Sequence, residues 1–142
     1  MEFDITRLNN NIDKSVLVNE TYSFTLDEMK EGISYAHRLG KKVYLTINLF
    51  THNHDLPRLN EFISHLKDLN PDGVIVADPG VFELLKRKLP DLPRHISTQA
   101  NILNYEAVKF WHEIGATRAI LARELPIKDV AEIKKQVALR HV

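Results

Sequence analysis

The side chains that could react or form hydrogen bonds with a ligand lie at four points of this sequence, each at the end of a short run of apolar residues. The first run, Val43–Asn48, ends in an amide, and the second, Val74–Ala77, is followed by a carboxylate. Since the carboxyl ends of parallel strands lie at one edge of a sheet, we expect the polar residues at the four strand ends to form one binding rim. These rim residues are Asn48, Asp78, Thr98, Gln99, Asn101, Arg123 and Glu124.

Most of the rim residues have two interpretations. Asp78 precedes a proline, which is typical of a helix N-cap, and the alternative is a catalytic or ligand-binding carboxylate. The amides of Gln99 and Asn101 suit a planar amide, a base edge or a peptide, or they merely close the loop. Arg123 and Glu124 either pair with each other, or Arg123 binds an anion or a carboxylate.

We predict catalytic roles for one carboxylate, one hydroxyl and one pair of charged residues: Asp78, Thr98, Arg123 and Glu124. We predict substrate-binding roles for three amides and two loop histidines: Asn48, Gln99, Asn101, His52 and His54. The two histidines would face one metal ion in an extended loop, but loop histidines are more often solvated, so we predict no metal site. Ser97 or Thr98 would act as a nucleophile only with a positioned base, for which His95 is the candidate.

Strands and helices alternate along the chain after residue 20, and these elements must position the rim. Four short apolar stretches predict strands at Val43–Asn48, Val74–Ala77, His95–Thr98 and Arg118–Ala122. Apolar residues at helical spacing predict helices at Thr25–Leu39, Asp55–Leu69, Pro79–Leu89, Tyr105–Ile114 and Ile127–Leu139. The first helix has clear end signals, because Thr25 and Glu28 form a capping-box pair and Gly40 is a natural stop. We expect Trp111 to pack in the core.

This alternation predicts an α/β fold of right-handed βα units with a parallel sheet. The strand starts lie roughly 21–31 residues apart, which is typical of a TIM (β/α)8 barrel, so the sequence predicts a partial barrel of about four strands. The alternative is an open doubly wound sheet, in which the strand order reverses once. No Gly-rich phosphate loop follows any of these strands. Residues 22–142 form the predicted domain, and residues 1–21 are a leader with one strand-like stretch, Ser15–Val18.

The composition fits one domain and excludes several kinds of site. The chain has 142 residues, of which 44% are hydrophobic and 27% charged, with no net charge. This balance argues against a general electrostatic hold on nucleic acid or on an anionic membrane. The absence of cysteine excludes disulfides, a thiolate nucleophile and a cysteine-held metal within the chain. No apolar run approaches the roughly 18–20 residues of a membrane span, and the polar N-terminus is not a secretory signal, so we expect a cytoplasmic protein.

Four stretches together resemble one known family. They are VYLTINLFTHNHDL (Val43–Leu56), DGVIVADPGVFELL (Asp72–Leu85), HISTQANILNYEAVKFW (His95–Trp111) and GATRAILARELPIKDVAEI (Gly115–Ile133). In this order and spacing, Phe24–Ile133 is similar to the collagenase-like peptidase family numbered thirty-two among peptidases of unknown catalytic type. The strings STQAN and LAREL are the most specific. The resemblance implies an eight-stranded barrel of which this chain holds the third to sixth strands, as a central fragment of a member.

The resemblance implies two kinds of activity. Our first hypothesis is the branch of the family that takes part in hydroxylating tRNA or ribosomal RNA, with a structured RNA as substrate. A related branch acts on the ubiquinone ring. The alternative is a collagenase-like peptidase, in which a metal at His52, His54 and Asp78 would activate water. The resemblance also implies that relatives carry an iron–sulfur cluster on cysteines outside the matched region, and we expect no cofactor in this chain.

A third hypothesis is a non-catalytic half-barrel. Four strands cannot close an eight-stranded barrel, so both edges of the sheet would be left without a partner strand. Such a chain is expected to associate with itself or to pair with a complementary half. The sequence leaves open whether the chain is an enzyme, and we expect it to be inactive alone and to make no membrane contact.

Overall fold

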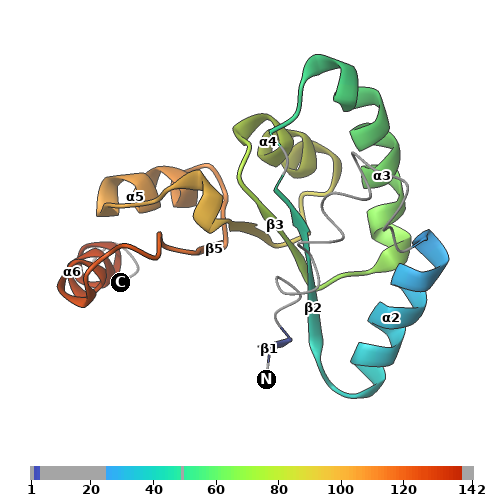
Figure 1. Ribbon diagram of the computed structural model, residues 1–142, viewed down its shortest axis with the longest axis horizontal. Helices are drawn as coiled ribbons and strands as arrows, with labels where there is room; N and C mark the ends of the chain where they lie inside the picture. Colours follow the sequence, from blue (N-terminus) through green and yellow to red (C-terminus); the bar gives the residue numbers. More distant parts are fainter. Residues whose placement is uncertain (1, 4–24, 49, 139–142) are drawn as a thin grey trace.

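The strands of the protein form one parallel sheet. The computed structural model describes residues 2–3, 25–48 and 50–138 (Figure 1). Within these ranges the five strands are β1 (Glu2–Phe3), β2 (Lys42–Ile47), β3 (Gly73–Val76), β4 (Arg94–Ile96) and β5 (Arg118–Ala119). They are neighbours in the order in which they occur along the chain, and every pair is parallel. The predicted α/β fold with parallel βα units is therefore confirmed.

The order of the strands separates the two fold alternatives. A doubly wound sheet needs one reversal of strand order, whereas a barrel adds each new strand beside the last. Among the described strands the order is β1-β2-β3-β4-β5, with no reversal. The sheet is therefore an arc of a (β/α) barrel, as predicted.

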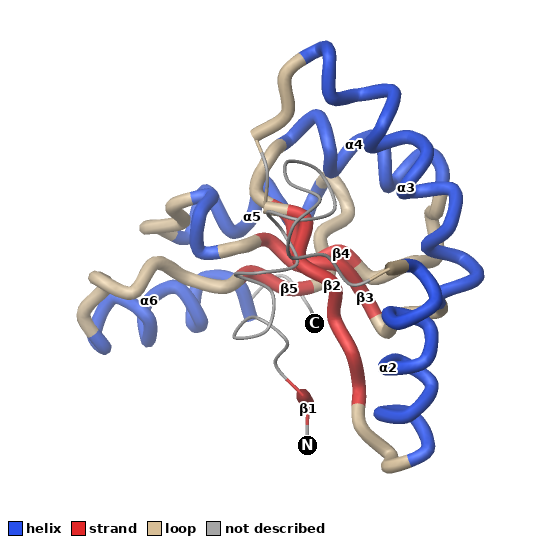
Figure 2. The backbone as a smooth tube through the Cα atoms, turned by 45° about the vertical axis from the view of Figure 1, so that its right-hand side comes forward, coloured by secondary structure: helices blue, strands red, loops and turns tan. Residues whose placement is uncertain are grey.

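Five helices connect and cover these strands: α2 (Leu26–Arg38), α3 (Leu56–Leu69), α4 (Pro79–Lys88), α5 (Tyr105–Glu113) and α6 (Ile127–Ala138). Figures 1 and 2 show α2, α3 and α4 grouped beside β2 and β3, with α5 and α6 together at the other end of the sheet. All five predicted helices are present, with small changes at their ends. None of the helices in the described residues has the length and apolar character to cross a membrane.

Local sequence signals set the ends of α2 as predicted. The Thr25 hydroxyl accepts the Glu28 backbone N–H, and a Glu28 carboxylate oxygen accepts the Thr25 N–H at 2.7 Å. This reciprocal pair satisfies two backbone donors that have no partner within the helix. At the other end, Gly40 adopts a left-handed conformation with φ 69°, which glycine adopts without a Cβ clash.

The core lies between the helices and one face of the sheet. Alternate residues of β2, namely Val43, Leu45 and Ile47, are buried against the helices. Phe82 of α4 is fully buried and meets the edge of the Trp111 ring, with 5.5 Å between the ring centroids. Trp111 is only 7% exposed, which confirms the prediction that it packs in the core.

The opposite face of the sheet carries a more polar row. The strand register aligns one residue from each of the strands β2 to β5, namely Thr46, Ile75, His95 and Arg118. The His95 ring lies 4.7 Å from the ring of Tyr44, and the Arg118 guanidinium lies 5.8 Å from the same ring. Gly73 leaves room for this ring, because a Cβ at Gly73 would lie 3.1 Å from Tyr44 Cδ1.

All four predicted strands differ at their ends from the observed ones, β2 and β3 by one residue and β4 and β5 by more. The third predicted strand ends at Ile96, because the chain turns at Ser97 into a short 3₁₀ helix, Thr98–Ala100. The fourth predicted strand is assigned only at Arg118–Ala119. The predicted strand-like stretch Ser15–Val18 lies outside the described residues. Strand β1, which pairs with β2 at the edge of the sheet, was not predicted from the sequence.

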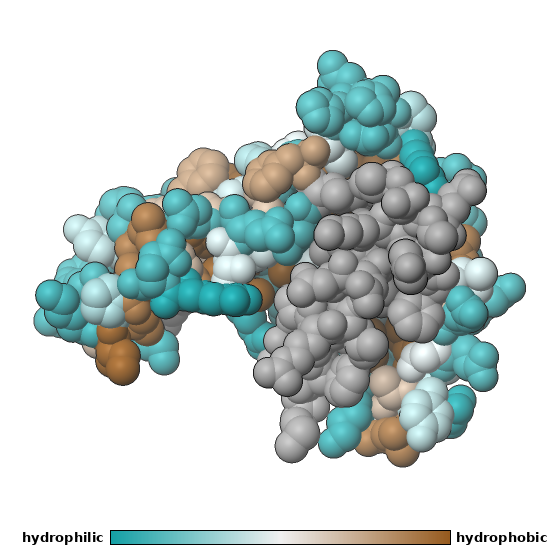
Figure 3. Space-filling model, in the orientation of Figure 1, coloured by the Kyte–Doolittle hydropathy of each residue, from teal (hydrophilic) through white to brown (hydrophobic). Residues whose placement is uncertain are grey.

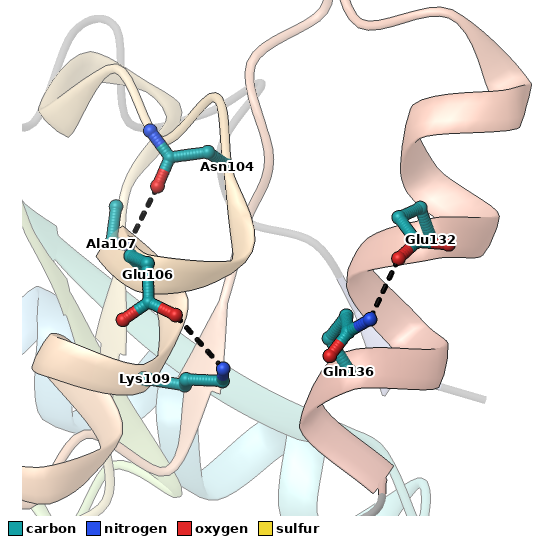
Figure 4. Close-up of polar contacts among 6 residues, drawn as sticks. All are labelled: Asn104, Glu106, Ala107, Lys109, Glu132 and Gln136. Carbon is teal, nitrogen blue, oxygen red and sulfur yellow. Dashed lines mark hydrogen bonds and ion pairs between the residues drawn. The ribbon is translucent and has the colours of Figure 1, made fainter.

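The N-cap of α5 allows a test of how much one capping hydrogen bond contributes to the stability of the protein. The Asn104 side chain caps this helix by accepting the Ala107 N–H at 2.9 Å, and Lys109 pairs with Glu106 one turn further on (Figure 4). We expect Asn104→Ala to lower the free energy of unfolding by about 1 kcal/mol, because one backbone donor loses its acceptor. Urea denaturation followed by circular dichroism measures this change. A variant as stable as the original protein would contradict the capping role.

Candidate functional site

The rim is formed where β2, β3 and β4 end. The register pairs Ile47 with Val76 and Val76 with Ile96, so the residues that follow these three strands stand at the same level of the sheet. These following residues are Asn48, Ala77 and Ser97, and Asp78 comes next after β3. The structure therefore brings together three of the four predicted strand ends through direct contacts.

Asp78 connects two parts of the rim. One carboxylate oxygen, Oδ1, accepts the N–H groups of Gly80 at 2.6 Å and Val81 at 3.2 Å, which makes Asp78 the N-cap of α4. The other oxygen, Oδ2, accepts the Thr51 N–H at 3.0 Å and the Thr51 hydroxyl at 3.3 Å. The carboxylate thus holds the loop after β2 against the start of α4. The sequence leaves Asp78 as either a helix N-cap or a ligand-binding carboxylate. In the structure it is an N-cap, and both of its carboxylate oxygens accept hydrogen bonds from the protein.

Asn48 and Ser97 form a second connection, between the ends of β2 and β4. Asn48 Nδ2 donates to Ser97 Oγ at 2.8 Å, and the same hydroxyl oxygen accepts the Gln99 N–H at 3.2 Å. Ser97 is 3% exposed. Asn48 Oδ1 is buried and has no hydrogen-bond partner among the residues that the structure describes. An unpaired buried carbonyl oxygen is unfavourable, so Asn48 is suited to accept a hydrogen bond from a bound group.

The possible nucleophiles Ser97 and Thr98 occupy a turn that is held by backbone contacts. Ser97 Oγ caps the 3₁₀ helix Thr98–Ala100, and the His95 ring packs on Tyr44 of β2, across the intervening strand β3. These contacts give the Ser97 hydroxyl a positioning role. Thr98 is half-buried in the same turn.

Gln99 and Asn101 are exposed on the outside of this turn. Asn101 ends the 3₁₀ helix with φ 53°, a left-handed conformation that asparagine tolerates better than most residues. Its backbone N–H donates to the Thr98 carbonyl at 3.0 Å. Both side-chain amides therefore face solvent at the end of β4, where they are available to a ligand, and Asn101 also closes the loop.

His52 and His54 are exposed and lie close to each other. Their rings stack with 5.5 Å between centroids, and His54 Nε2 lies 3.3 Å from a carboxylate oxygen of Asp55. Over the described part of the chain, no three His, Asp or Glu side chains are grouped so that they could hold a metal ion. The alternative of a metal at His52, His54 and Asp78 therefore has no support in the geometry.

Arg123 and Glu124 follow β5 and are both exposed. Within residues 25–48 and 50–138 the two side chains form no ion pair with each other. The interpretation as a salt bridge at the rim is thus not realised, and both groups remain accessible to a ligand. Their predicted catalytic roles stay predictions.

Sequence reasoning missed Arg94, a buried charged residue at the beginning of β4. Its side chain is 6% exposed, and Nη1 donates to three backbone carbonyls, those of Leu89, Pro90 and Leu92, at 2.9–3.1 Å. Burial lowers the pKa of Arg94, and the nearby Glu83 carboxylate partly opposes this effect. Arg94 lies at the amino end of the strand, opposite the rim, and its role is to hold the loop between α4 and β4.

Two hollows in the described residues lie away from the rim. One of about 390 Å³ lies between the end of α3 and the loop after α4, and its lining includes Leu66, Lys67 and Pro93. The other, of about 210 Å³, lies between α5, β5 and α6 beside Trp111 and Val137. On the face drawn in Figure 3, hydrophobic residues lie among hydrophilic ones at the end of the molecule where α5 and α6 lie, and smaller hydrophobic spots appear elsewhere on the coloured surface.

The fold and the rim define a class of protein: a parallel (β/α) barrel, present here as an arc, with its polar residues at the carboxyl ends of the strands. The sequence profile described as peptidase family U32 matches residues 17–141. The chain belongs to this family, as the resemblance indicated.

Several curated relatives of the chain carry RNA-related names. Over 112 residues, 79% of this chain, it is 48% identical to the tRNA hydroxylation protein P of Helicobacter pylori. Over 117 residues, 80% of this chain, it is 42% identical to the tRNA hydroxylation protein P of Escherichia coli. The chain spans about a quarter of the length of these relatives, 26% and 25% respectively.

A solved structure supports the fold independently. The structure of the U32 peptidase Mk0906 superimposes with a TM-score of 0.69 and covers 90% of this chain and 54% of that chain, at 23% sequence identity. At this identity the likeness shows the fold alone. It agrees with an arc of a barrel, because the matched region is about half of the larger structure.

Proposed function

We propose that this chain is the RNA-facing part of a U32 protein of the RNA-hydroxylation branch. The observation that carries the proposal is the 48% identity to a tRNA hydroxylation protein over 112 residues. The match to the family profile over residues 17–141 includes the whole rim. Asn48, Gln99 and Asn101 place three amides at the rim, and amides can match the donors and acceptors of a base edge. Structured RNA is read mostly at exposed, unpaired bases, which suits such a surface.

The described residues supply binding and orientation. Hydroxylation of a base removes electrons from the substrate, and the family resemblance implies an iron–sulfur cluster held by cysteine thiolates. This chain contains no cysteine, so its residues do not fit such a cluster. We therefore assign the rim of this chain to substrate recognition and derive no redox step from it.

A chimera tests the proposal directly. The matching segment of the E. coli tRNA hydroxylation protein P is replaced by the homologous segment of this chain, and the chimera is expressed in cells that lack the native protein. Because rim residues are contained in the exchanged segment, we expect the hydroxylated nucleoside to reappear in digests of total tRNA. Mass spectrometry of these digests measures it.

The control is a chimera in which the exposed rim amides are removed by Gln99→Ala and Asn101→Gly. Both side chains are exposed, and glycine adopts the left-handed conformation of position 101 without strain, so these changes are expected to leave the fold intact and to reduce the hydroxylated nucleoside several-fold. A well-folded, soluble chimera without any hydroxylated nucleoside would contradict the proposal. A double variant that is as active as the parent chimera would contradict the role of the two amides.

We further propose that other strands complete this sheet. In the described residues β5 is paired only with β4, so one edge of the sheet offers backbone groups to a further strand. The occupant is either the rest of a longer barrel or a second copy. We propose the cytoplasm as the location, because a tRNA substrate is found there.

A further inference from the structure

The loop after β2 presents an aromatic ring to solvent at the rim. Phe50 is 62% exposed, which is unusual for a phenylalanine next to a buried strand. The strand that leads into this loop, β2, is buried from Val43 to Ile47. The ring is therefore held outside the core although the chain beside it is well packed.

Both flanks of Phe50 are fixed to neighbouring strand ends. On one side, Asn48 is held by Ser97 through the 2.8 Å hydrogen bond from Nδ2 to Oγ. On the other side, the Thr51 N–H and hydroxyl are held by the Asp78 carboxylate. An exposed ring anchored in this way loses little further conformational freedom when it binds a flat partner.

The second polar atom of Asn48 complements the ring. Asn48 Oδ1 is buried without a partner, two residues before Phe50 in the chain. If the amide is turned over, Ser97 Oγ donates to Oδ1 and Nδ2 becomes the atom without a partner. In either orientation one buried amide atom remains to be satisfied, which is unfavourable unless a bound group pairs with it.

We infer that Phe50 is the stacking platform for one unpaired nucleobase of the RNA, and that the Asn48 amide hydrogen-bonds to an edge of that base. A flat aromatic face attracts any base, and an adjacent amide adds a directional contact. The neutral charge of the chain favours recognition through bases over recognition through phosphates. This inference rests on the proposed function, because it names the RNA feature that the rim contacts.

Fluorescence anisotropy with two labelled RNAs tests the inference on the 142-residue chain. The probes are an unmodified tRNA and an unstructured oligo(U), and an abasic ribose-phosphate oligomer of the same length serves as competitor. We expect Phe50→Leu to weaken binding of both probes about ten-fold, because leucine keeps the hydrophobic side chain but cannot stack. We expect Phe50→Trp to bind at least as tightly as the original protein, and the abasic oligomer to compete poorly.

Phe110→Leu is the matched control, because Phe110 is 54% exposed and lies on α5, outside the rim. It is expected to leave binding unchanged. Asn48→Ala is expected to weaken binding several-fold, and circular dichroism confirms that each variant is folded. Binding of tRNA that Phe50→Leu does not change overturns the stacking inference alone. Failure of the original protein to bind either RNA overturns the inference together with the RNA-binding role proposed above.

Discussion

Replacing Arg94 by methionine is expected to lower the free energy of unfolding by about 3 kcal/mol. Methionine fills much of the same space but removes the guanidinium donor from the carbonyls of Leu89, Pro90 and Leu92, of which the Leu89 oxygen keeps the Leu92 N–H as a second donor. A buried acceptor that loses its donor costs about 1–3 kcal/mol, and because Pro90 is exposed and Leu92 half-buried, water reduces the sum. Urea denaturation measures the change.

The desolvation of the Arg94 guanidinium partly offsets the expected loss of stability. Burial lowers the pKa of Arg94, which means that the folded protein disfavours the charged guanidinium. Because arginine stays charged over the whole accessible pH range, this cost is present at every pH and the predicted destabilisation does not vary with pH. A methionine variant as stable as the original protein would show that desolvation outweighs the hydrogen bonds. Arg94→Lys is expected to be intermediate, since one ammonium group cannot reach all the carbonyls.

Replacing Asp78 by alanine is expected to cost about 2–3 kcal/mol and to weaken RNA binding. The change removes the cap of α4, worth about 1 kcal/mol, and also leaves the Thr51 N–H without its acceptor. Asn104→Ala, which removes only a cap, is the reference, and the excess over it measures the anchoring of the loop. Denaturation and anisotropy with tRNA provide the two measurements.

Asp78→Ser separates the two functions of this carboxylate. Serine is a good N-cap, but its shorter side chain with one oxygen cannot also reach Thr51. We expect this variant to recover most of the stability while RNA binding stays weak, because the loop that carries Phe50 is no longer held. Equal recovery of stability and binding would contradict the anchoring role of Asp78.

Most of the elements could be predicted because their signals are local. The capping box at Thr25, the proline after Asp78 and the glycine stop at Gly40 each depend on residues a few positions apart. The parallel order of the strands followed from their alternation with helices. The strand ends were less predictable, because the bend at Ser97 depends on its contact with Asn48, which lies 49 residues away.

The site was predictable in location more than in detail. The rim lies at the ends of the strands, as expected, and Asp78 does cap a helix. Asp78 also accepts hydrogen bonds from Thr51, which belongs to the loop of the preceding βα unit. No pattern in the sequence shows that this loop lies beside Asp78. Arg94 was missed for the same reason, because its partners are backbone carbonyls that become available only when the loop before β4 folds back.

The unbroken order of the strands also has a consequence for how the chain folds. Each strand pairs with the strand of the preceding βα unit, so every step of sheet assembly closes a loop of only one unit. Short closures cost less chain entropy than distant ones and tend to form sooner. A ribosome releases the units in the order in which they pair, so β2 and β3 can meet while β5 is still being synthesised. Folding that keeps pace with translation would leave the growing edge of the sheet exposed only until the next strand emerges.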